Sequence, residues 1–332
     1  MATNRRIVLA SRPQGAAATS NFRLEEVPVP ALLPGQILVR NLWLSLDPYM
    51  RGRMNEGRSY AVAQALDDVM VGGTAGEVVE SRNAGFAAGD KVVAYLGWQE
   101  YGVSDGTGVF KVDTRHVPLS AYLGPVGMPG VTAWYGLNRI IEPKQGETIV
   151  VSAASGAVGS VVGQLARIGG CRAIGIAGGA EKCDYVTKEL GFDACIDYKS
   201  EDVGRRLKEA APDGVDGYFE NVGGEIMEAV LPRMNAFGRI ALCGRIAGYD
   251  GKPLPIKNPA WFLISRLLLR GFIVTEHMDV WPGALKELGG HVATGHIKYR
   301  ETVANGIENA PQAFLGMLKG ANFGKQLVKL AG

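Results

Sequence analysis

The sequence predicts an α/β protein in which a β-rich domain is followed by a doubly wound parallel sheet. Residues 1 to about 120 contain short β-type runs separated by turn residues, whereas residues 122–294 alternate between strand-like and helical patterns. In the second region, a glycine turn lies between an apolar run and an amphipathic run. At 332 residues, with 47% hydrophobic and 20% charged residues, the chain is long enough for two cores.

The first domain is predicted to span residues 1–121 and to form a partly barrel-like β structure. Its clearest strand candidates are residues 37–43, 72–80 and 89–95. The last stretch, residues 295–332, has a different rhythm, with a strand near 298–303, a helix near 310–318 and a strand at 326–330. We expect this C-terminal segment to return to the first domain.

The second domain, residues 122–294, contains six strand candidates. Residues 148–151 are β-branched and almost wholly apolar, as a parallel strand buried on both faces requires. The other candidates are residues 173–177, 194–197, 215–219, 239–243 and 272–274. Six is the number of strands in a complete dinucleotide-binding fold of the Rossmann type.

The turn after residues 148–151 has the pattern A-x-G-x-x-G, from Ala154 to Gly159. Gly156 allows the backbone to approach a pyrophosphate, and Gly159 allows the following helix to pack closely on the strand. Apolar residues then recur at helical spacing to Ile168, so the free amides and dipole of a helix N-terminus favour an anion. The alternative is an ordinary tight turn, but its place between strand and helix favours a dinucleotide.

The end of the second strand indicates which dinucleotide is bound. NAD sites usually place an acid about 20 residues past the glycines. Here that position falls on Gly178 and Gly179; the first acid is Glu181, and Lys182 follows with a charge suited to a 2′-phosphate. The sequence therefore favours NADPH over NADH. The alternative is that Lys182 is a solvated helix lysine.

Composition excludes several other classes of protein. The net charge is +2 with no long single-sign run, so neither nucleic acid nor an anionic membrane is expected as a partner. The longest apolar stretch, residues 261–269, is interrupted by Ser265 and Arg266, and no signal-peptide core is apparent. We expect a cytoplasmic protein.

No metal site is predicted. None of the cysteines forms a C-x-x-C pair. We expect all four to be small buried hydrophobic residues in a reducing compartment. The four histidines are scattered, and His291 and His296 are five residues apart, off the face that a helical metal pair would use.

Six runs together resemble the zinc-independent branch of the medium-chain dehydrogenase/reductase superfamily, and the resemblance covers nearly the whole chain. The runs are LDPYMRGRM (46–54), MPGVTA (128–133), the glycine turn, GGAEKC (178–183), ENVGG (220–224) and NFGK (322–325). This branch contains leukotriene B4 12-hydroxydehydrogenase/prostaglandin reductases, alkenal double-bond reductases and bacterial NADPH-dependent curcumin reductases. It implies a GroES-like domain, a Rossmann domain and a homodimer.

Position by position, the resemblance implies three groups of NADPH-binding residues, for the diphosphate, the 2′-phosphate side and the nicotinamide side. The first group is Gly156, Ala157, Val158 and Gly159, the second is Lys182 and Tyr198, and the third is Asn221, Cys243, Gly244, Arg245, Tyr249, Ile273, Val274, Thr275 and Asn322. Asn221 could instead cap a strand end, and Asn322 could be a turn residue.

The resemblance also implies the reaction, in which a hydride passes from NADPH to the β carbon of an α,β-unsaturated ketone or aldehyde. The resulting enolate needs one or two hydrogen-bond donors, and without a metal these are neutral hydroxyls, amides or the ribose. The candidate side chains are Tyr49, Tyr60 and Tyr249. Each has a plainer alternative, which is core packing for Tyr49, a surface ring for Tyr60 and packing for Tyr249.

The sequence departs from the family at one position. Mammalian and plant members carry a tyrosine in the helix before the last Rossmann strand, where this chain has Ile264. That tyrosine therefore has no counterpart here. Arg51 and Arg53 could bind an acidic substrate, but the favoured interpretation is that they are solvated or pair with acids such as Asp47.

Other functions stay open at this stage. A quinone reductase of the same superfamily would need the same cofactor wall, and a non-catalytic NADPH-binding or structural protein would keep the fold. Reversible alcohol oxidation would require the zinc that the sequence does not predict. The natural substrate is not encoded in a readable motif.

Overall fold

The computed structural model describes residues 3–330, and they divide into two compact units. Unit 1 extends to Leu123 and resumes at Glu301, and unit 2 is Gly124–Arg300. The domain boundaries expected after residues 121 and 294 remain predictions. The predicted fold class, a β-rich GroES-like part and a doubly wound Rossmann part, is confirmed by the architecture of the two units.

Unit 1 is built on a seven-stranded sheet with the order β14-β15-β3-β4-β5-β7, and β6 also pairs with β3. A separate hairpin joins β1 to β2. The elements are β1 (Thr3–Leu9), β2 (Phe22–Pro28), β3 (Ile37–Ser45), α1 (Tyr49–Arg53), β4 (Thr74–Ser81), β5 (Lys91–Ala94), β6 (Tyr101–Ser104), β7 (Phe110–Lys111), β14 (Glu301–Asn305), α9 (Ala310–Leu318) and β15 (Lys325–Lys329).

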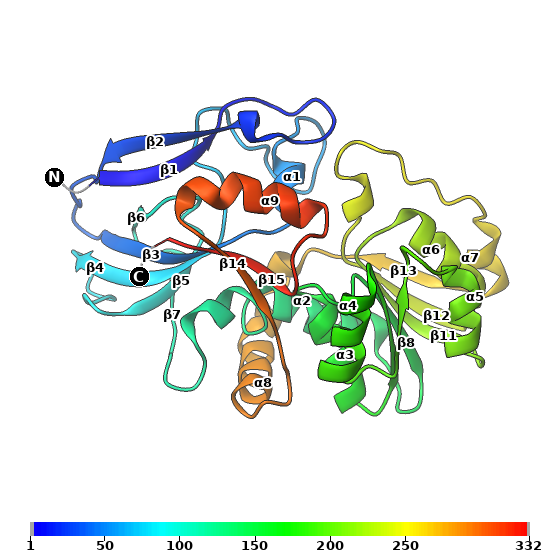
Figure 1. Cartoon of the computed structure of the whole chain (residues 1–332). Coiled ribbons are helices and arrows are strands. Elements are labelled where there is room, and N and C mark those ends of the chain that lie inside the picture. The colour runs from blue at the N-terminus through cyan, green and yellow to red at the C-terminus, as the bar shows by residue number, and fades with distance from the viewer. Residues whose placement is uncertain (1–2, 331–332) are drawn as a thin grey trace. The chain divides into compact units, whose positions relative to one another are not determined.

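The C-terminal segment is part of the unit 1 sheet because β15 pairs antiparallel with β3 and parallel with β14. Helix α9 covers this end of the sheet, as Figure 1 shows. Its Phe314 meets Phe22 and Trp98 in one aromatic cluster, with ring centroids 5.5–6.2 Å apart. Burial of these rings stabilises the region where β3 ends and α1 begins, the place of Tyr49.

Unit 2 is a six-stranded sheet with the order β10-β9-β8-β11-β12-β13, and every neighbouring pair is parallel. Its elements are α2 (Met128–Gly136), β8 (Thr148–Ser152), α3 (Gly159–Ile168), β9 (Arg172–Ala177), α4 (Ala180–Asp184), β10 (Ala194–Asp197), α5 (Val203–Ala210), β11 (Val215–Glu220), α6 (Gly224–Val230), β12 (Met234–Leu242), α7 (Ala260–Ile264), β13 (Leu268–Gly271) and α8 (Trp281–Ala293).

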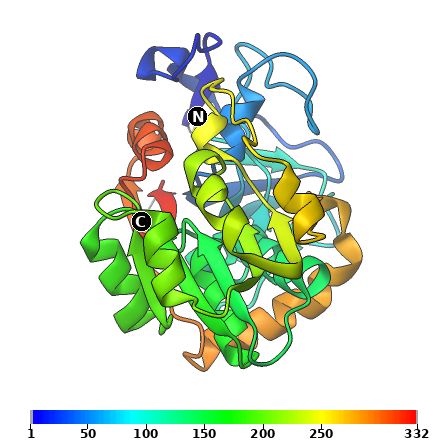
Figure 2. The ribbon, with the colours of Figure 1, turned by 90° about the vertical axis from the view of Figure 1, so that its right-hand side faces the viewer.

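The strand order of unit 2 reverses between β8 and β11, which makes this the topological switch point of the sheet. All five residues of β8 are buried, as the apolar run predicts for a central strand covered on both faces. Helix α2 packs on both α3 and α8, and α5 packs on α6. Figures 1 and 2 show these helices flanking the strands of unit 2.

Two sequence expectations for the strands of unit 2 need correction. The last strand is Leu268–Gly271 rather than 272–274, and Val274–Glu276 is a 3-10 turn. The register explains the difference, because β12 pairs through Arg239 with Leu268 and through Leu242 with Gly271. Apolar residues continue past Gly271, so their pattern alone does not reveal where pairing stops. Strand β12 also begins earlier than predicted, at Met234.

No helix among residues 3–330 is long and apolar enough to cross a lipid bilayer. The four cysteines are free thiols. Cys171 is buried as expected, whereas the other three residues are partly exposed, although the thiol of Cys243 is itself shielded from water.

Candidate functional site

The glycine turn connects β8 to α3 at the carboxyl edge of the unit 2 sheet. A Cβ at Gly159 would lie 2.4 Å from the carbonyl oxygen of Ala153, so only glycine lets α3 begin this close to the strand. The three residues before Gly159 in the turn are each half-exposed: Gly156, Ala157 and Val158. The first amides of any helix lack intrahelical acceptors, so this turn offers donors to a diphosphate at the switch point.

The next strand end carries two cations rather than an acid. Lys182 lies on α4, and burial together with the like charge of Lys199 lowers the pKa of its ammonium group. Lys199, which sequence analysis did not identify, follows β10 two residues after Asp197. A bound phosphate dianion would offset the unfavourable effect of Lys199 on the charge of Lys182. The sequence did contain a signal for this second lysine, because Lys199 directly follows Tyr198, which was predicted to contact the 2′-phosphate side.

Tyr198 occupies the place where an NAD-type acid would stand. A Cβ at Gly178 would lie 2.9 Å from Cε1, Cζ and Oη of Tyr198, so the ring lies directly against the Gly178 backbone. Tyr198 is 46% exposed, which leaves part of the ring free for a ligand. The position that sequence analysis singled out for its missing carboxylate is thus covered by an aromatic ring.

Asp197 holds this corner together. Its carboxylate accepts hydrogen bonds from the Gly179 amide (2.7 Å), the Lys199 amide (3.0 Å) and the Ser200 hydroxyl (2.7 Å). Burial by itself would raise the pKa of Asp197, but these three hydrogen bonds outweigh it and lower the pKa. The carboxylate therefore ties the end of β9 to the end of β10 and sets the place of Tyr198 and Lys199.

On the other side of the switch point, Asn221 follows β11. Its side-chain amide donates to the Ser152 carbonyl at 2.8 Å, and its backbone amide donates to Ser152 Oγ at 2.7 Å. Asn221 thus joins the ends of β8 and β11, as the strand-end alternative foresaw, while its side-chain oxygen is not used by these bonds. A cofactor contact by that oxygen stays a prediction.

Glu220, the last residue of β11, is fully buried and was missed by sequence analysis. Its carboxylate accepts from Ser152 Oγ (2.7 Å), Tyr218 Oη (2.6 Å) and the Val222 amide (2.5 Å). Burial, followed by the charge of Glu220, raises the pKa of Tyr218 well above its ordinary value. A carboxylate beside an asparagine at a strand end has no sequence signal that distinguishes it from a solvated acid.

The same segment organises the loop after β12. The carbonyl of Glu220 accepts from the amides of Cys243 and Gly244, and the carbonyl of Asn221 accepts from Ile246. Burial, and then the charge of Glu220, raises the pKa of Cys243 to about 12, so this thiol stays neutral. Most of the predicted nicotinamide-side residues therefore lie on loops that are hydrogen-bonded to one another.

The remaining unit 2 candidates lie further along the chain. Arg245 is exposed, and Tyr249 is half-buried at the end of a 3-10 turn, Ile246–Gly248. Ile273 precedes the 3-10 turn Val274–Glu276, in which Val274 is buried and Thr275 is exposed. A nicotinamide contact by these residues stays a prediction. Ile264 ends α7 and is 56% exposed.

In unit 1, the run after β3 contains a buried ion pair. Lys325 Nζ lies 2.5 Å from Asp47 Oδ1 and 2.7 Å from the Leu46 carbonyl, and Asp47 also accepts from the Ser45 hydroxyl. The side chains of Lys325 and Asp47 are 3% and 8% exposed. The pair joins the end of β3 to β15 directly before the helix that carries Tyr49.

Tyr49 begins α1 and is half-buried. Burial, followed by the charges of Asp47 and Tyr95, raises the pKa of Tyr49 well above its ordinary value, and Tyr60 also contributes. Tyr95, which sequence analysis missed, and Tyr60 both act on the Tyr49 phenol through their charges, and each of the two is 58% exposed.

Asn322 precedes β15, and its side-chain amide donates to the Gly324 carbonyl at 2.8 Å. This is the bond of a turn residue, and a cofactor contact by Asn322 remains a prediction. Arg51 is 1% exposed and donates to Asn55 and to the Gly15 carbonyl, while Asp47 pairs with Lys325. Arg51 is therefore not solvated, and Asp47 pairs with Lys325 rather than with Arg51. Pairing of Arg51 with another acid stays a prediction.

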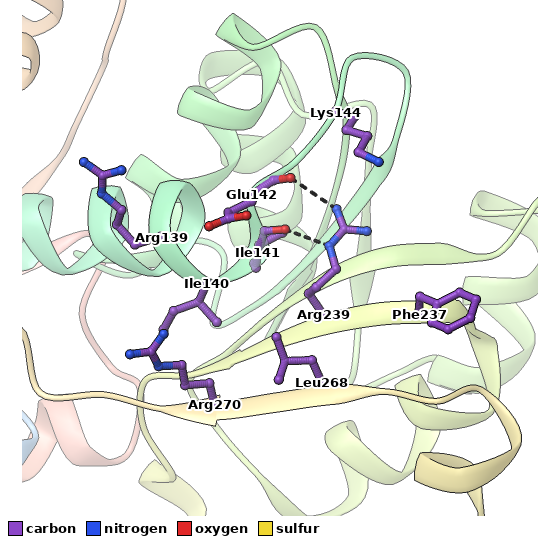
Figure 3. A pocket seen from close by; sticks show the side chains of 9 residues that line it. All are labelled: Arg139, Ile140, Ile141, Glu142, Lys144, Phe237, Arg239, Leu268 and Arg270. Carbon is purple, nitrogen blue, oxygen red and sulfur yellow. Dashed lines mark hydrogen bonds between the residues drawn. The ribbon is translucent and has the colours of Figure 1, made fainter.

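Unit 2 also has a cavity of about 430 Å³ at the opposite edge of its sheet. Figure 3 shows Arg239 pointing to the carbonyls of Ile141 and Glu142, with Arg139 and Arg270 on the other side of the pocket. In register, Arg239 lies level with the beginning of β13 at Leu268. The cavity is therefore far along the strands from the glycine turn and is not part of the cofactor edge.

Within residues 3–330, no group of three or more His, Cys, Asp or Glu side chains is arranged to hold a metal ion. The hydrogen-bond donors described above are amides, phenols and lysines, which suit a phosphorylated dinucleotide and a carbonyl substrate. Gly159, the uncovered Tyr198 ring and the pair Lys182 and Lys199 fit NADPH in particular.

Comparison with known proteins agrees with this geometry. Residues 5–112 match the family model described as the N-terminal domain of oxidoreductase, and residues 157–289 match the one described as zinc-binding dehydrogenase. The chain is 47% identical to an NADPH-dependent curcumin reductase of Escherichia coli, over 99% of this chain and 97% of that one. It is 40% identical to a tobacco 2-alkenal reductase (NADP(+)-dependent), over 99% and 98%.

Among solved structures, CurA of Vibrio vulnificus in complex with NADPH shares 46% of its sequence with this chain. The two superimpose with a TM-score of 0.94 over 99% of each chain. An Escherichia coli quinone oxidoreductase complexed with NADPH is only 22% identical, with a TM-score of 0.79 over 98% of this chain and 99% of that one. This second likeness extends to the fold alone.

Proposed function

Because the chain belongs to the zinc-independent branch of the medium-chain dehydrogenase/reductase superfamily, we infer that it reduces the carbon–carbon double bond of α,β-unsaturated ketones and aldehydes with NADPH. The observation that carries the cofactor preference is the corner formed by Lys182, Lys199 and Tyr198, with Gly178 in place of an acid. When bound, the cofactor supplies the hydride that reaches the β carbon of the substrate.

The residues of the chain bind the cofactor, orient the substrate and stabilise the charge that develops on it. We propose that the glycine turn holds the diphosphate, that Lys182, Lys199 and Tyr198 hold the 2′-phosphate side, and that Asn221 with the loop after β12 lines the nicotinamide side. Tyr49, Tyr60 or Tyr249 would donate to the developing enolate oxygen. The half-buried place of Tyr49 supports this role, since a phenol in such surroundings can donate a hydrogen bond with little competition from water.

We assign the two roles to separate regions. Residues 1–121 and the returning segment 295–332 would serve the substrate and its oxyanion, and residues 122–294 would bind NADPH. The assignment rests on the parallel sheet and glycine turn of unit 2 and on the phenols of unit 1.

The test is consumption of NADPH with a small enone, with a quinone and with no added substrate, followed by identification of the product. Conversion of the enone to the saturated ketone, with little consumption in the other two reactions, supports the proposal. Preference for the quinone would favour the alternative quinone reductase, and no consumption above background would favour a non-catalytic NADPH-binding protein. Alcohol oxidation abolished by a zinc chelator would contradict the metal-independent mechanism.

We further propose that the protein is a homodimer joined through β13. This strand lies at the edge of the unit 2 sheet, and Leu263, Ile264 and Leu268 nearby are 79%, 56% and 52% exposed. An exposed apolar edge strand is a ready site for pairing with a second copy. Light scattering should show a dimer for the wild-type protein and a monomer for Leu268→Lys; a wild-type monomer would contradict the proposal.

A cytoplasmic location is also proposed. All four cysteines are free, which suits a reducing compartment, and the proposed reaction consumes NADPH. Recovery of the native protein in a membrane or secreted fraction of its cells would contradict this location.

A further inference from the structure

Glu220 is a buried carboxylate without a cationic partner. Its side chain is fully enclosed, and no lysine or arginine of residues 3–330 forms an ion pair with it. Its partners are two hydroxyls, from Ser152 and Tyr218, and the Val222 amide. Buried charges are usually paired, so this arrangement needs a reason.

The hydrogen bonds around Glu220 come from groups that can all donate to it. Ser152 Oγ accepts from the Asn221 amide, and its own proton has a shorter path to Glu220 Oε1, at 2.7 Å, than to the Phe219 carbonyl, at 3.4 Å. The Val222 amide donates to the same oxygen, and the Tyr218 phenol donates to Oε2. Three donors and no acceptor fit an ionised carboxylate, which only accepts.

The topology places this charge beside one half of the cofactor site. In a doubly wound sheet, the dinucleotide lies across the carboxyl edge with one mononucleotide over each half, and its diphosphate is at the first strand–helix turn. That turn follows β8, and the basic corner of Lys182 and Lys199 marks the β9 and β10 side as the adenosine half. Glu220 ends β11, so it lies under the nicotinamide half.

The two redox states of the cofactor differ in charge at this half, because the oxidised nicotinamide ring is a cation and the reduced ring is neutral. We propose that Glu220 selectively stabilises the bound oxidised cofactor and so makes bound NADPH a stronger hydride donor. The inference rests on NADPH being the cofactor, as in the proposed function. Glu220 does not touch the reacting atoms in this proposal; it acts through its field, which the buried surroundings screen weakly.

The test measures the dissociation constants of NADP⁺ and NADPH for the full-length wild-type protein and Glu220→Gln, by fluorescence titration and calorimetry. Glutamine keeps the shape and the hydrogen bonds, because its carbonyl oxygen accepts from Ser152 and Val222 and the Tyr218 hydroxyl can turn to accept from its amide. We expect NADP⁺ binding to weaken about tenfold, by interaction with a unit charge at low screening, and NADPH binding to change less than about twofold. Tenfold corresponds to about 30 mV in the two-electron potential of the bound cofactor.

A merely structural role for Glu220 would weaken both cofactors equally, and that result would overturn the inference. If the glutamine variant does not fold, Tyr218→Phe decides, because it removes a donor and leaves the charge. Because the carboxylate then loses a compensating donor, the affinity for NADP⁺ should rise relative to that for NADPH, and an unchanged ratio or a shift toward NADPH would overturn the inference. Failure of the wild-type protein to bind either cofactor would refute the proposed function and this inference with it; normal binding with an unchanged ratio refutes only this inference.

Discussion

Asp47 and Glu220 are both buried carboxylates at the end of a strand, one in each unit, but they are compensated in different ways. Asp47 forms an ion pair with Lys325 at 2.5 Å, so the charges at the end of β3 cancel. Glu220 is held by two hydroxyls and an amide, so the end of β11 keeps a net negative charge. The first arrangement joins two strands, whereas the second leaves a field at the edge of the sheet.

The comparison shows that the partners of a buried acid indicate whether its charge serves stability or acts on its surroundings. An ion pair that buries both charges cannot lose one member cheaply, because the other is left uncompensated. A carboxylate held by neutral donors can be replaced by an amide without leaving a charge behind. The two sites should therefore respond very differently to loss of the acid's charge.

The largest effect is expected for Asp47→Asn. It leaves the Lys325 ammonium buried without its partner, and the free energy of unfolding should fall by about 3–5 kcal/mol. Urea denaturation followed by tryptophan fluorescence measures this change. The double variant Asp47→Leu, Lys325→Met should recover most of the loss, and a cost below about 1 kcal/mol in the single variant would contradict the pairing seen here.

The next largest effect is expected for the three tyrosines proposed to donate to the enolate oxygen. At least one of Tyr49→Phe, Tyr60→Phe and Tyr249→Phe should lower kcat/KM on an enone about 100-fold, the usual result of removing an oxyanion donor. Steady-state kinetics check this, with Tyr122→Phe as control, because the Tyr122 hydroxyl donates to the Asp113 carbonyl at the surface of unit 1. Wild-type kinetics in all three would assign oxyanion stabilisation to the ribose hydroxyl or to backbone amides.

A smaller effect is expected at the basic corner, where charge is half-exposed rather than buried. Lys182→Ala should weaken NADPH binding about tenfold and leave NADH binding nearly unchanged, since only the 2′-phosphate loses a charged donor. Titration of both cofactors measures the difference. Lys188→Ala is a matched control, because this lysine pairs with Asp184 one turn further along. Equal losses for NADH and NADPH would remove Lys182 from the 2′-phosphate.

The smallest effect is expected for the stability of Glu220→Gln. Because the amide side chain satisfies the same partners and leaves no unpaired ion, the free energy of unfolding should change by about 1 kcal/mol or less. The same urea denaturation used for Asp47→Asn allows a direct comparison. If Glu220→Gln cost as much as Asp47→Asn, the distinction between the two buried acids would be wrong.

The elements that could be predicted from the sequence are those whose hydrophobic pattern follows from burial. The run 148–151 is apolar because β8 is covered on both faces, and the helix predicted at 310–318 is α9 because its apolar spacing faces the unit 1 core. The turn glycines were also predictable, since Gly159 meets backbone that tolerates no Cβ. These features depend on local pattern.

The remainder depends on contacts between distant residues. The end of β13 is set by its register with β12, and the role of Glu220 is set by Ser152, 68 residues earlier. Lys325 and Asp47 are 278 positions apart in the chain, so their pairing has no local signal. Polar residues at strand ends look alike in the sequence, whether they are solvated, paired or buried.

The Tyr198 ring over Gly178 has a consequence for how this protein could change its cofactor. A carboxylate at residue 178 is what recognition of an unphosphorylated ribose calls for, yet any Cβ there would lie 2.9 Å from three atoms of the ring. Gly178→Asp would therefore require the Tyr198 ring to turn away, and this ring is 46% exposed, so it has room to do so. One substitution would then change both the charge of the ribose site and the aromatic surface that the cofactor meets there.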